Sequence, residues 1–292
     1  MSSIDTIDIH THLHPPKLFA AIRRWFAEHS EWDMAGAPTE PQAVADVLHA
    51  HGVRRFVFCS YAHKPGMASD LNAWLAQTSR DLGGYGLPLA TVHPGDAGCL
   101  DDLRTALDDG CIGLKLHEDV QRLEVDDARL EPVFATLAER GAFALVHVGP
   151  IPWDYPPDAG AARVARVLER HPQLRLVVAH YGVPDTDRFF ALMDEHPGLY
   201  LDTTMVFASQ SPMHISLARP HGLETVPEID CEALEMHADR VLYGTDYPNI
   251  PFTYPTERDA IVALGLGGAT QRAILHDNAA ALIAQVSARG RR

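Results

Sequence analysis

The stretch that decides the fold is IDTIDIHTH, residues 4–12, close to the start of the 292-residue chain. Its β-branched isoleucines and threonines predict a strand over Ile4–Thr11. His10 and His12 are two residues apart, so on a strand their side chains point to the same face. The stretch therefore predicts a strand that carries two imidazoles to one side.

Seven further apolar runs follow, separated by longer segments with helical periodicity. Most of these runs are continuously apolar, which is typical of parallel strands covered on both faces. We expect strands over Arg55–Ser60, Gly86–His93, Ile112–His117, Phe143–Val148, Leu174–His180, Leu199–Thr203 and Val241–Thr245. We expect helices over Pro41–His51, Asp101–Asp109, Leu130–Arg140, Ala161–His171 and Thr186–His196, and a final helix over Thr270–Gln285.

Eight strands alternating with helices fit either a closed barrel or a doubly wound open sheet. Neither GxGxxG nor GxxxxGK[ST] follows the first strand, which argues against the open sheet. We therefore predict an α/β fold, a (β/α)₈ TIM barrel, as a single domain over residues 1–292. Two longer inserts, His14–Thr39 and Met205–Pro227, follow strand ends where such barrels build substrate loops.

Composition narrows the function classes. With 39 acidic and 24 basic residues, the net charge of −15 disfavours nucleic acids and anionic membranes as partners. No apolar stretch approaches the roughly 20 residues that span a bilayer, and the N-terminus lacks the charged and apolar regions of a signal peptide. The four cysteines show no CxxC spacing, and Cys59 and Cys111 stand in apolar runs typical of buried, inert thiols. We expect a cytoplasmic protein that acts on a small molecule.

The informative histidines among the 17 stand at strand ends. Taken singly, a histidine that closes a strand is more often a hydrogen-bonded core or turn residue, and Asp246 before Tyr-Pro has the pattern of a turn cap. Together, so many polar side chains at the carboxyl ends of barrel strands would be costly to bury without a shared role. The set that predicts a metal site comprises His10, His12, Lys115, His117, His147, His180 and Asp246.

In order and in strand position, these residues resemble the amidohydrolase superfamily. The matching pieces are Asp8–His12, His147, His180 and Gly244–Asp246, and the resemblance covers nearly the whole chain. The chain is most similar to the compact branch called amidohydrolase-related or amidohydrolase type 2, which its ending, Ile274–Ala279, also resembles. Homodimers are common in that branch, so the resemblance leaves a homodimer open.

The resemblance leaves the number of metal ions open. Cys111–Asp119 is similar to a urease stretch in which the lysine is carboxylated and bridges two ions. That likeness implies a Lys115 bridge, a second ion on His147 and His180, and a first ion on the remaining ligands, His10, His12 and Asp246. In the compact branch, this lysine is often unmodified and one ion is bound.

We favour one ion. The resemblance then implies that His180 faces the bound water and that the ligands are His10, His12, His147 and Asp246. Zn²⁺ suits a site rich in nitrogen and carboxylate ligands, with Mn²⁺, Fe²⁺, Co²⁺ or Ni²⁺ as alternatives.

Hydrolysis of an amide, cyclic amide, lactone or ester is the function that we expect. Such an ion would polarise the substrate carbonyl and activate a water. Asp246 would take the proton of that water, His180 would orient the water or stabilise the oxyanion, and His117 would contact the carbonyl or support a ligand. The alternative is a metal-dependent non-oxidative decarboxylase. A metal-binding protein without turnover is disfavoured because structural zinc sites are usually closed.

Overall fold

Eight strands form one sheet in which each strand lies beside the next in sequence order. The computed structural model describes residues 4–29, 34, 36–148, 159–208 and 229–289. The strands are β1 Thr6–His12, β2 Val53–Cys59, β3 Gly86–Thr91, β4 Gly113–His117, β5 Phe143–His147, β6 Arg175–Val178, β7 Leu199–Asp202 and β8 Val241–Leu242. Every neighbouring pair from β1 to β8 is parallel.

The sheet curls until its two ends meet. The Ile9 N–H donates to the carbonyl of Tyr243 at 2.8 Å, and the Asp246 N–H donates to the carbonyl of His10 at 2.8 Å. These bonds join β1 to the segment that follows β8. The predicted (β/α)₈ barrel is therefore confirmed.

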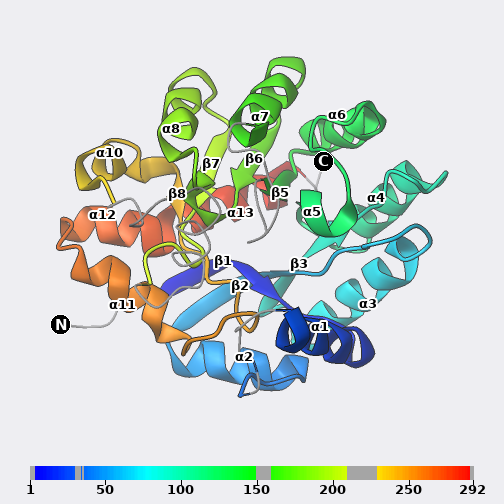
Figure 1. Ribbon diagram of the computed structural model, residues 1–292, viewed down its shortest axis with the longest axis horizontal. Helices are drawn as coiled ribbons and strands as arrows, with labels where there is room; N and C mark the ends of the chain where they lie inside the picture. Colours follow the sequence, from blue (N-terminus) through cyan, green and yellow to red (C-terminus); the bar gives the residue numbers. More distant parts are fainter. Residues whose placement is uncertain (1–3, 30–33, 35, 149–158, 209–228, 290–292) are drawn as a thin grey trace.

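The helices lie outside the strands and surround them (Figure 1). They are α1 Pro16–His29, α2 Pro41–Ala50, α3 Ala68–Asp81, α4 Cys99–Asp108, α5 Glu118–Gln121, α6 Glu131–Arg140, α7 Ala159–Arg170, α8 Thr186–Glu195, α10 Cys231–Met236, α11 Pro255–Ala263, α12 Gly268–Arg272 and α13 Asn278–Arg289. The predicted insert His14–Thr39 contains α1. Most of the other insert, residues 209–227, lies outside the described residues. A π-helical turn, Ala273–Asp277, interrupts the predicted final helix.

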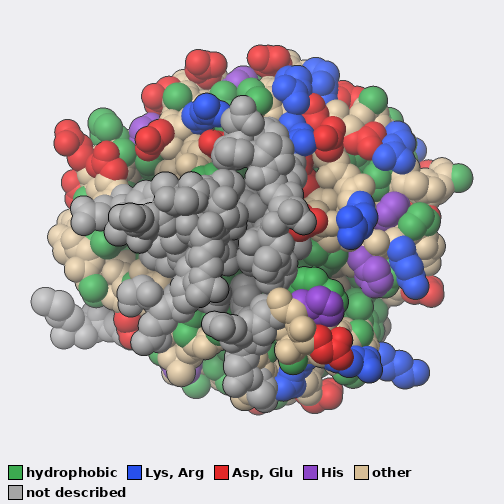
Figure 2. Space-filling model, in the orientation of Figure 1, with side chains coloured by type: hydrophobic (Ala, Val, Ile, Leu, Met, Phe, Trp, Pro, Cys, Tyr) green, Lys and Arg blue, Asp and Glu red, His purple; other side chains and the backbone are tan. Residues whose placement is uncertain are grey.

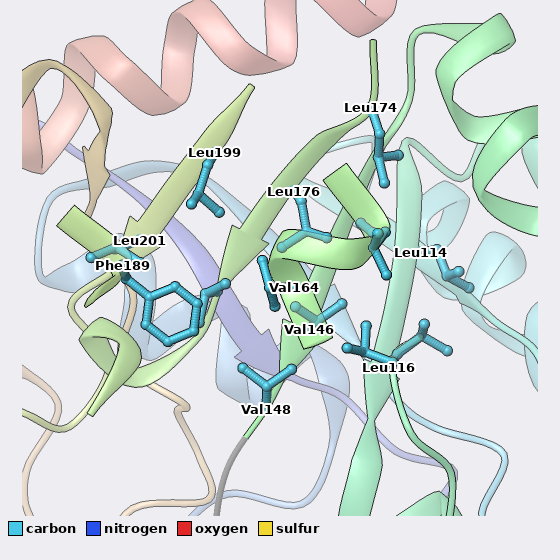
Figure 3. Packing of buried hydrophobic residues seen from close by; sticks show 14 of the residues in the cluster. Leu114, Leu116, Val146, Val148, Val164, Leu174, Leu176, Phe189, Leu199 and Leu201 are labelled. Atoms are coloured by element: carbon cyan, nitrogen blue, oxygen red, sulfur yellow. The ribbon is translucent and has the colours of Figure 1, made fainter. Parts of the chain in front are cut away.

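Alternation along each strand separates the core from the site. In β4, Leu114 and Leu116 belong to the apolar layer between the barrel and its helices, while Lys115 and His117 take the opposite face. Figure 3 shows this outer layer, in which the strand side chains meet residues of α7 and α8 such as Val164 and Phe189. Because side chains alternate between the two faces of a strand, the polar residues of β4 point into the barrel.

The last strand is shorter than predicted. We expected Val241–Thr245, but β8 ends at Leu242. Beyond it, the Tyr243 N–H donates to Ile274 and the Thr245 N–H to His10, so the backbone no longer pairs with β7. This turn towards β1 carries Asp246 to the mouth of the barrel.

The described surface carries both signs of charge. Figure 2 shows acidic side chains along much of the outer edge and basic ones mostly in the right-hand half of this view. Three arginines of α7 pair with carboxylates of the preceding segments: Arg163 with Glu124, Arg166 with Asp126, and Arg170 with Glu131. No helix in the described part of the chain is long and apolar enough to cross a membrane.

Candidate metal centre

The end of β1 supplies the first two side chains of the site. His10 and His12 are 1% and 2% exposed, and their ring centroids lie 5.2 Å apart. Both rings lie on the same face because the strand repeats every two residues. The HxH pattern therefore delivers two buried imidazoles to one place.

Asp246 meets both rings from the segment after β8. Its Oδ1 lies 2.8 Å from Nε2 of His12 and 3.1 Å from Nε2 of His10. Its backbone has a φ of 68°, in the left-handed region that few residues other than glycine adopt. Such backbone strain is characteristic of functional sites. The tight turn aims the carboxylate at the two imidazoles.

These three side chains offer donor atoms of the kind that bind a divalent ion. Ligand atoms about 2.0–2.2 Å from a tetrahedral zinc ion lie roughly 3.4 Å from one another. The separations of 2.8 and 3.1 Å between Asp246 and the two Nε2 atoms are close to that spacing. The donor set, two imidazole nitrogens and one carboxylate oxygen, also fits such an ion chemically.

Lys115 points from β4 to the same place. The side chain is 1% exposed, and its Nζ lies 2.9 Å from Nε2 of His10. That contact places the amine inside the barrel, beside the first histidine of the site. Whether the amine is carboxylated stays a prediction.

Three further histidines continue the cluster around the barrel. His117 and His147 close neighbouring strands, and their rings stack with centroids 4.0 Å apart. The ring of His180 lies 4.5 Å from that of His147 and 5.7 Å from that of His10. The structure thus brings together all the side chains that the sequence analysis selected: His10, His12, Lys115, His117, His147, His180 and Asp246.

Burial and charge set the protonation of this cluster. Burial lowers the pKa of His117, His147 and His180, so these imidazoles are neutral at pH 7. Burial and the nearby Lys115 lower the pKa of His10 to about 4.

Asp246 and His12 form the charged pair of the cluster. Burial alone would raise the pKa of Asp246, but His12 holds it well below its usual value. Burial would lower the pKa of His12, but contacts with Cys59 and Asp246 raise it to about 10. Without an ion, the site therefore contains an imidazolium–carboxylate pair.

Asp202 is a site residue that the sequence analysis missed. It ends β7, and its Oδ2 lies 2.9 Å from Nδ1 of His10. A carboxylate on the far nitrogen of a metal-binding histidine fixes its tautomer, so that Nε2 carries no proton and can bind an ion. The pattern that selected the other residues, a polar side chain at a strand end, applies to Asp202 as well.

His14 was also missed, and Cys59 was expected only as a buried thiol. His14 is buried and stacks on His12 with ring centroids 5.4 Å apart, while its Nδ1 lies 2.8 Å from Oγ of Ser60. Cys59 is buried as predicted, and its Sγ lies 3.4 Å from Nδ1 of His12. One donor atom each from His10, His12 and Cys59 lie within 4.8 Å of one another.

The sequence was compared with models of known protein families. The sequence model of the family described as Amidohydrolase matches residues 7–284. The chain belongs to the amidohydrolase family. The resemblance inferred from the strand-end residues is thereby confirmed, and so is membership of an enzyme superfamily. No curated protein matches the chain.

Solved structures with the same fold include several at low sequence identity. An uncharacterized TIM-barrel protein from Bordetella bronchiseptica is 22% identical to this amidohydrolase, with a TM-score of 0.72 over 97% of this chain and 99% of that one. A 5-carboxyvanillate decarboxylase from Novosphingobium aromaticivorans, complexed with manganese, is 15% identical, with a TM-score of 0.65 over 96% of each chain. A probable 2-pyrone-4,6-dicarboxylic acid hydrolase from Acinetobacter baumannii is 16% identical, with a TM-score of 0.63 over 96% and 99%. These likenesses show the fold.

Proposed function

We propose that this amidohydrolase is a metal-dependent hydrolase that cleaves an amide, cyclic amide, lactone or ester bond of a small molecule. The observation that carries the proposal is the convergence of two imidazoles on one carboxylate: His10 and His12 lie 3.1 and 2.8 Å from Oδ1 of Asp246. The convergence lies at the carboxyl ends of the strands, where barrel enzymes act.

The ion that we propose is a single Zn²⁺, with another divalent transition metal as the alternative. Its ligands are His10, His12, His147 and Asp246. When bound, such an ion supplies Lewis acidity, which polarises a carbonyl and acidifies a water. A second ion would require a carboxylated Lys115 and would recruit His180.

Asp246 is the residue that we expect to move the proton. Its carboxylate is ionised, and its side chain is 14% exposed whereas that of His12 is 3% exposed. It is therefore the more open member of the pair. We expect it to accept a proton from the attacking water and to pass that proton to the leaving group.

His180 is suited to orient the water. Its Nδ1 lies 3.2 Å from the carbonyl oxygen of Thr204, so Nδ1 carries the proton and donates it to that oxygen. Because burial keeps the ring neutral, Nε2 is then an acceptor. An acceptor can hold the hydrogen of a water but cannot donate to an oxyanion. Of the two roles considered from the sequence, this geometry supports water orientation.

His117 is suited to contact the substrate. Its Nδ1 is buried and has no hydrogen-bond partner among the described residues. Buried polar atoms are normally paired, so a partner from outside the described residues is expected. We propose that the partner is the polarised carbonyl group of the substrate or a water beside it.

A decarboxylase is the second candidate, and one observation favours it. Lys115 is 1% exposed and its Nζ contacts Nε2 of His10, while no carboxylate of the described residues lies within ion-pairing distance of it. Burying an amine with no anion to pair with is costly. A carboxylate-bearing substrate would supply that anion.

Elemental analysis and product analysis together test the proposal. Purified protein should contain one divalent ion per chain, and both His10→Ala and Asp246→Ala should lose the ion. His276→Ala, which changes a partly exposed histidine paired with Asp277 outside the cluster, is the matched control and should keep it. If the ion content survives both site substitutions, the ligand assignment is wrong.

The reaction class is tested on the metal-loaded protein. A panel of amides, lactones, esters and aromatic carboxylic acids should give turnover that releases acid without CO₂. Release of CO₂ in proportion to substrate loss would replace the hydrolase with the decarboxylase. Absence of turnover across the panel with the metal fully loaded would count against both.

A further inference from the structure

The imidazole of His12 has a neighbour on each of its two nitrogens. Nε2 faces Asp246 at 2.8 Å, and Nδ1 faces the sulfur of Cys59 at 3.4 Å. Cys59 ends β2 and is the register partner of His12 in the β1–β2 pair. Neighbouring strands therefore place the thiol beside the far nitrogen of the ring.

The direction of these hydrogen bonds follows from the thiol's other contact. The Cys59 S–H points to the carbonyl oxygen of Thr11 at 3.4 Å, and a carbonyl can only accept. With its hydrogen used there, the sulfur presents a lone pair to Nδ1 of His12. That nitrogen then carries the hydrogen and donates to sulfur.

We propose that Cys59 is a positioning residue that fixes the tautomer of His12. With the hydrogen held on Nδ1, the neutral ring offers an unprotonated Nε2 to an ion shared with Asp246. This inference rests on the metal centre of the proposed function. Cys59 would then orient the ring of His12 as Asp202 orients the ring of His10.

The two histidines of the pair are therefore held by different chemistry. His10 donates to a carboxylate, which makes its ring a more basic ligand. His12 donates to a neutral sulfur, a weaker acceptor. The thiol orients the ring without adding a second negative charge beside Asp246.

Direct ligation by Cys59 is the competing arrangement. Donor atoms of His10, His12 and Cys59 come within 4.8 Å of one another, so an ion bound by all three is conceivable. The sulfur, however, contacts Nδ1 of His12, whereas the carboxylate of Asp246 contacts Nε2. An ion held by Asp246 and Nε2 of His12 would use the ring nitrogen that does not face the thiol.

Cobalt titration separates the two arrangements. Metal-depleted full-length protein is titrated with Co²⁺, the absorption spectrum is recorded, and affinity is measured by competition with a chelator. The variants are Cys59→Ala, Cys59→Val, which fills the space without an acceptor, and Cys59→Ser, which keeps one. Cys111→Ala is the matched control because Cys111 is also buried but packs in the apolar layer outside the barrel.

The expected result is one Co²⁺ per wild-type chain with no sulfur-to-cobalt charge-transfer absorption. Cys59→Ala and Cys59→Val should keep that stoichiometry but bind about 10- to 100-fold more weakly. Cys59→Ser should lose less affinity, and Cys111→Ala should match the wild type.

Two results would overturn the inference while leaving the metal centre in place. Charge-transfer absorption that disappears in Cys59→Ala would make the thiol a ligand. Equal affinity in Cys59→Val, Cys111→Ala and the wild type would make Cys59 a packing residue. A wild-type protein that binds no Co²⁺ at all would instead refute the proposed function, and this inference with it.

Discussion

Nδ1 of His10 lies 2.9 Å from Oδ2 of Asp202, although 192 residues separate the two in the sequence. The other carboxylate oxygen accepts hydrogen bonds from the backbone N–H groups of His180, at 2.9 Å, and Thr204, at 3.1 Å. One buried carboxylate thus orients the ring of His10 and holds the backbone of His180. Through Asp202, the end of β7 determines the geometry of residues that the chain places far apart.

Replacement of this carboxylate by an amide should weaken metal binding. In Asp202→Asn, the amide cannot accept from His10 and from both backbone N–H groups at once, so the tautomer of His10 is no longer fixed. We expect about 10- to 100-fold weaker affinity in a chelator competition assay. Asp108→Asn, which removes an exposed partner of Arg140, is the control. Equal affinity in both variants would show that Asp202 does not support the site.

Removal of the Lys115 amine should leave the metal content unchanged. In the one-ion proposal, Lys115 contacts His10 as a free amine and ligates nothing. Lys115→Met keeps the length of the buried side chain, and elemental analysis should find one ion per chain in both proteins. Both should be prepared with and without added bicarbonate. Two ions in the wild type and one in the variant would identify a carboxylated lysine that bridges them.

Glu257 should make the protein less stable as the pH rises. This buried carboxyl accepts hydrogen bonds from the N–H groups of Phe207 and Ala208, each at 3.2 Å. Burial raises its pKa well above the ordinary value of 4.5. A group whose pKa is raised on folding contributes stability that is complete below its unfolded pKa and is lost as the pH rises towards its folded pKa.

Urea unfolding of metal-depleted protein measures this effect. Glu257→Gln cannot ionise, so the free energy of unfolding of the wild type relative to the variant should fall above about pH 4.5, by at most about 1.4 kcal/mol per pH unit. Glu139→Gln changes an exposed glutamate on α6 and should show no such trend. Parallel pH profiles for the wild type and Glu257→Gln would contradict the prediction.

A methyl group at Gly113 should destabilise the barrel. A Cβ built on this residue of β4 would lie 2.4 Å from the carbonyl oxygen of Phe143 on the neighbouring strand. We expect Gly113→Ala to lower the free energy of unfolding in urea by about 1–3 kcal/mol, the usual cost of overpacking. Gly268→Ala is the control because nothing lies within 4 Å of its added Cβ. Equal stabilities would mean that β4 and β5 can separate without cost.

Much of the fold could be predicted because its signals are local. Each predicted strand exists. A strand that is covered on both faces needs a continuous apolar run, such as Phe143–Val148, and such a run can be recognised from the sequence alone. The end of β8 could not be predicted, because residues 243–245 form hydrogen bonds with Ile274 and His10 instead of β7. Those partners are remote in the sequence.

The sequence by itself determined the barrel and most members of its polar cluster, but not Asp202 or His14. Side chains alternate along a strand, so the spacing of His10 and His12 puts them on the same face. His147 and His180 stand at or just after the ends of their strands, so they lie at the carboxyl end of the barrel. Each of these placements depends only on the residue's own position along its strand. Only the tertiary structure decided which nitrogen of each ring faces the cluster. That choice depends on contacts from other strands, Asp202 on His10 and Cys59 on His12, and these exist only once the barrel has closed.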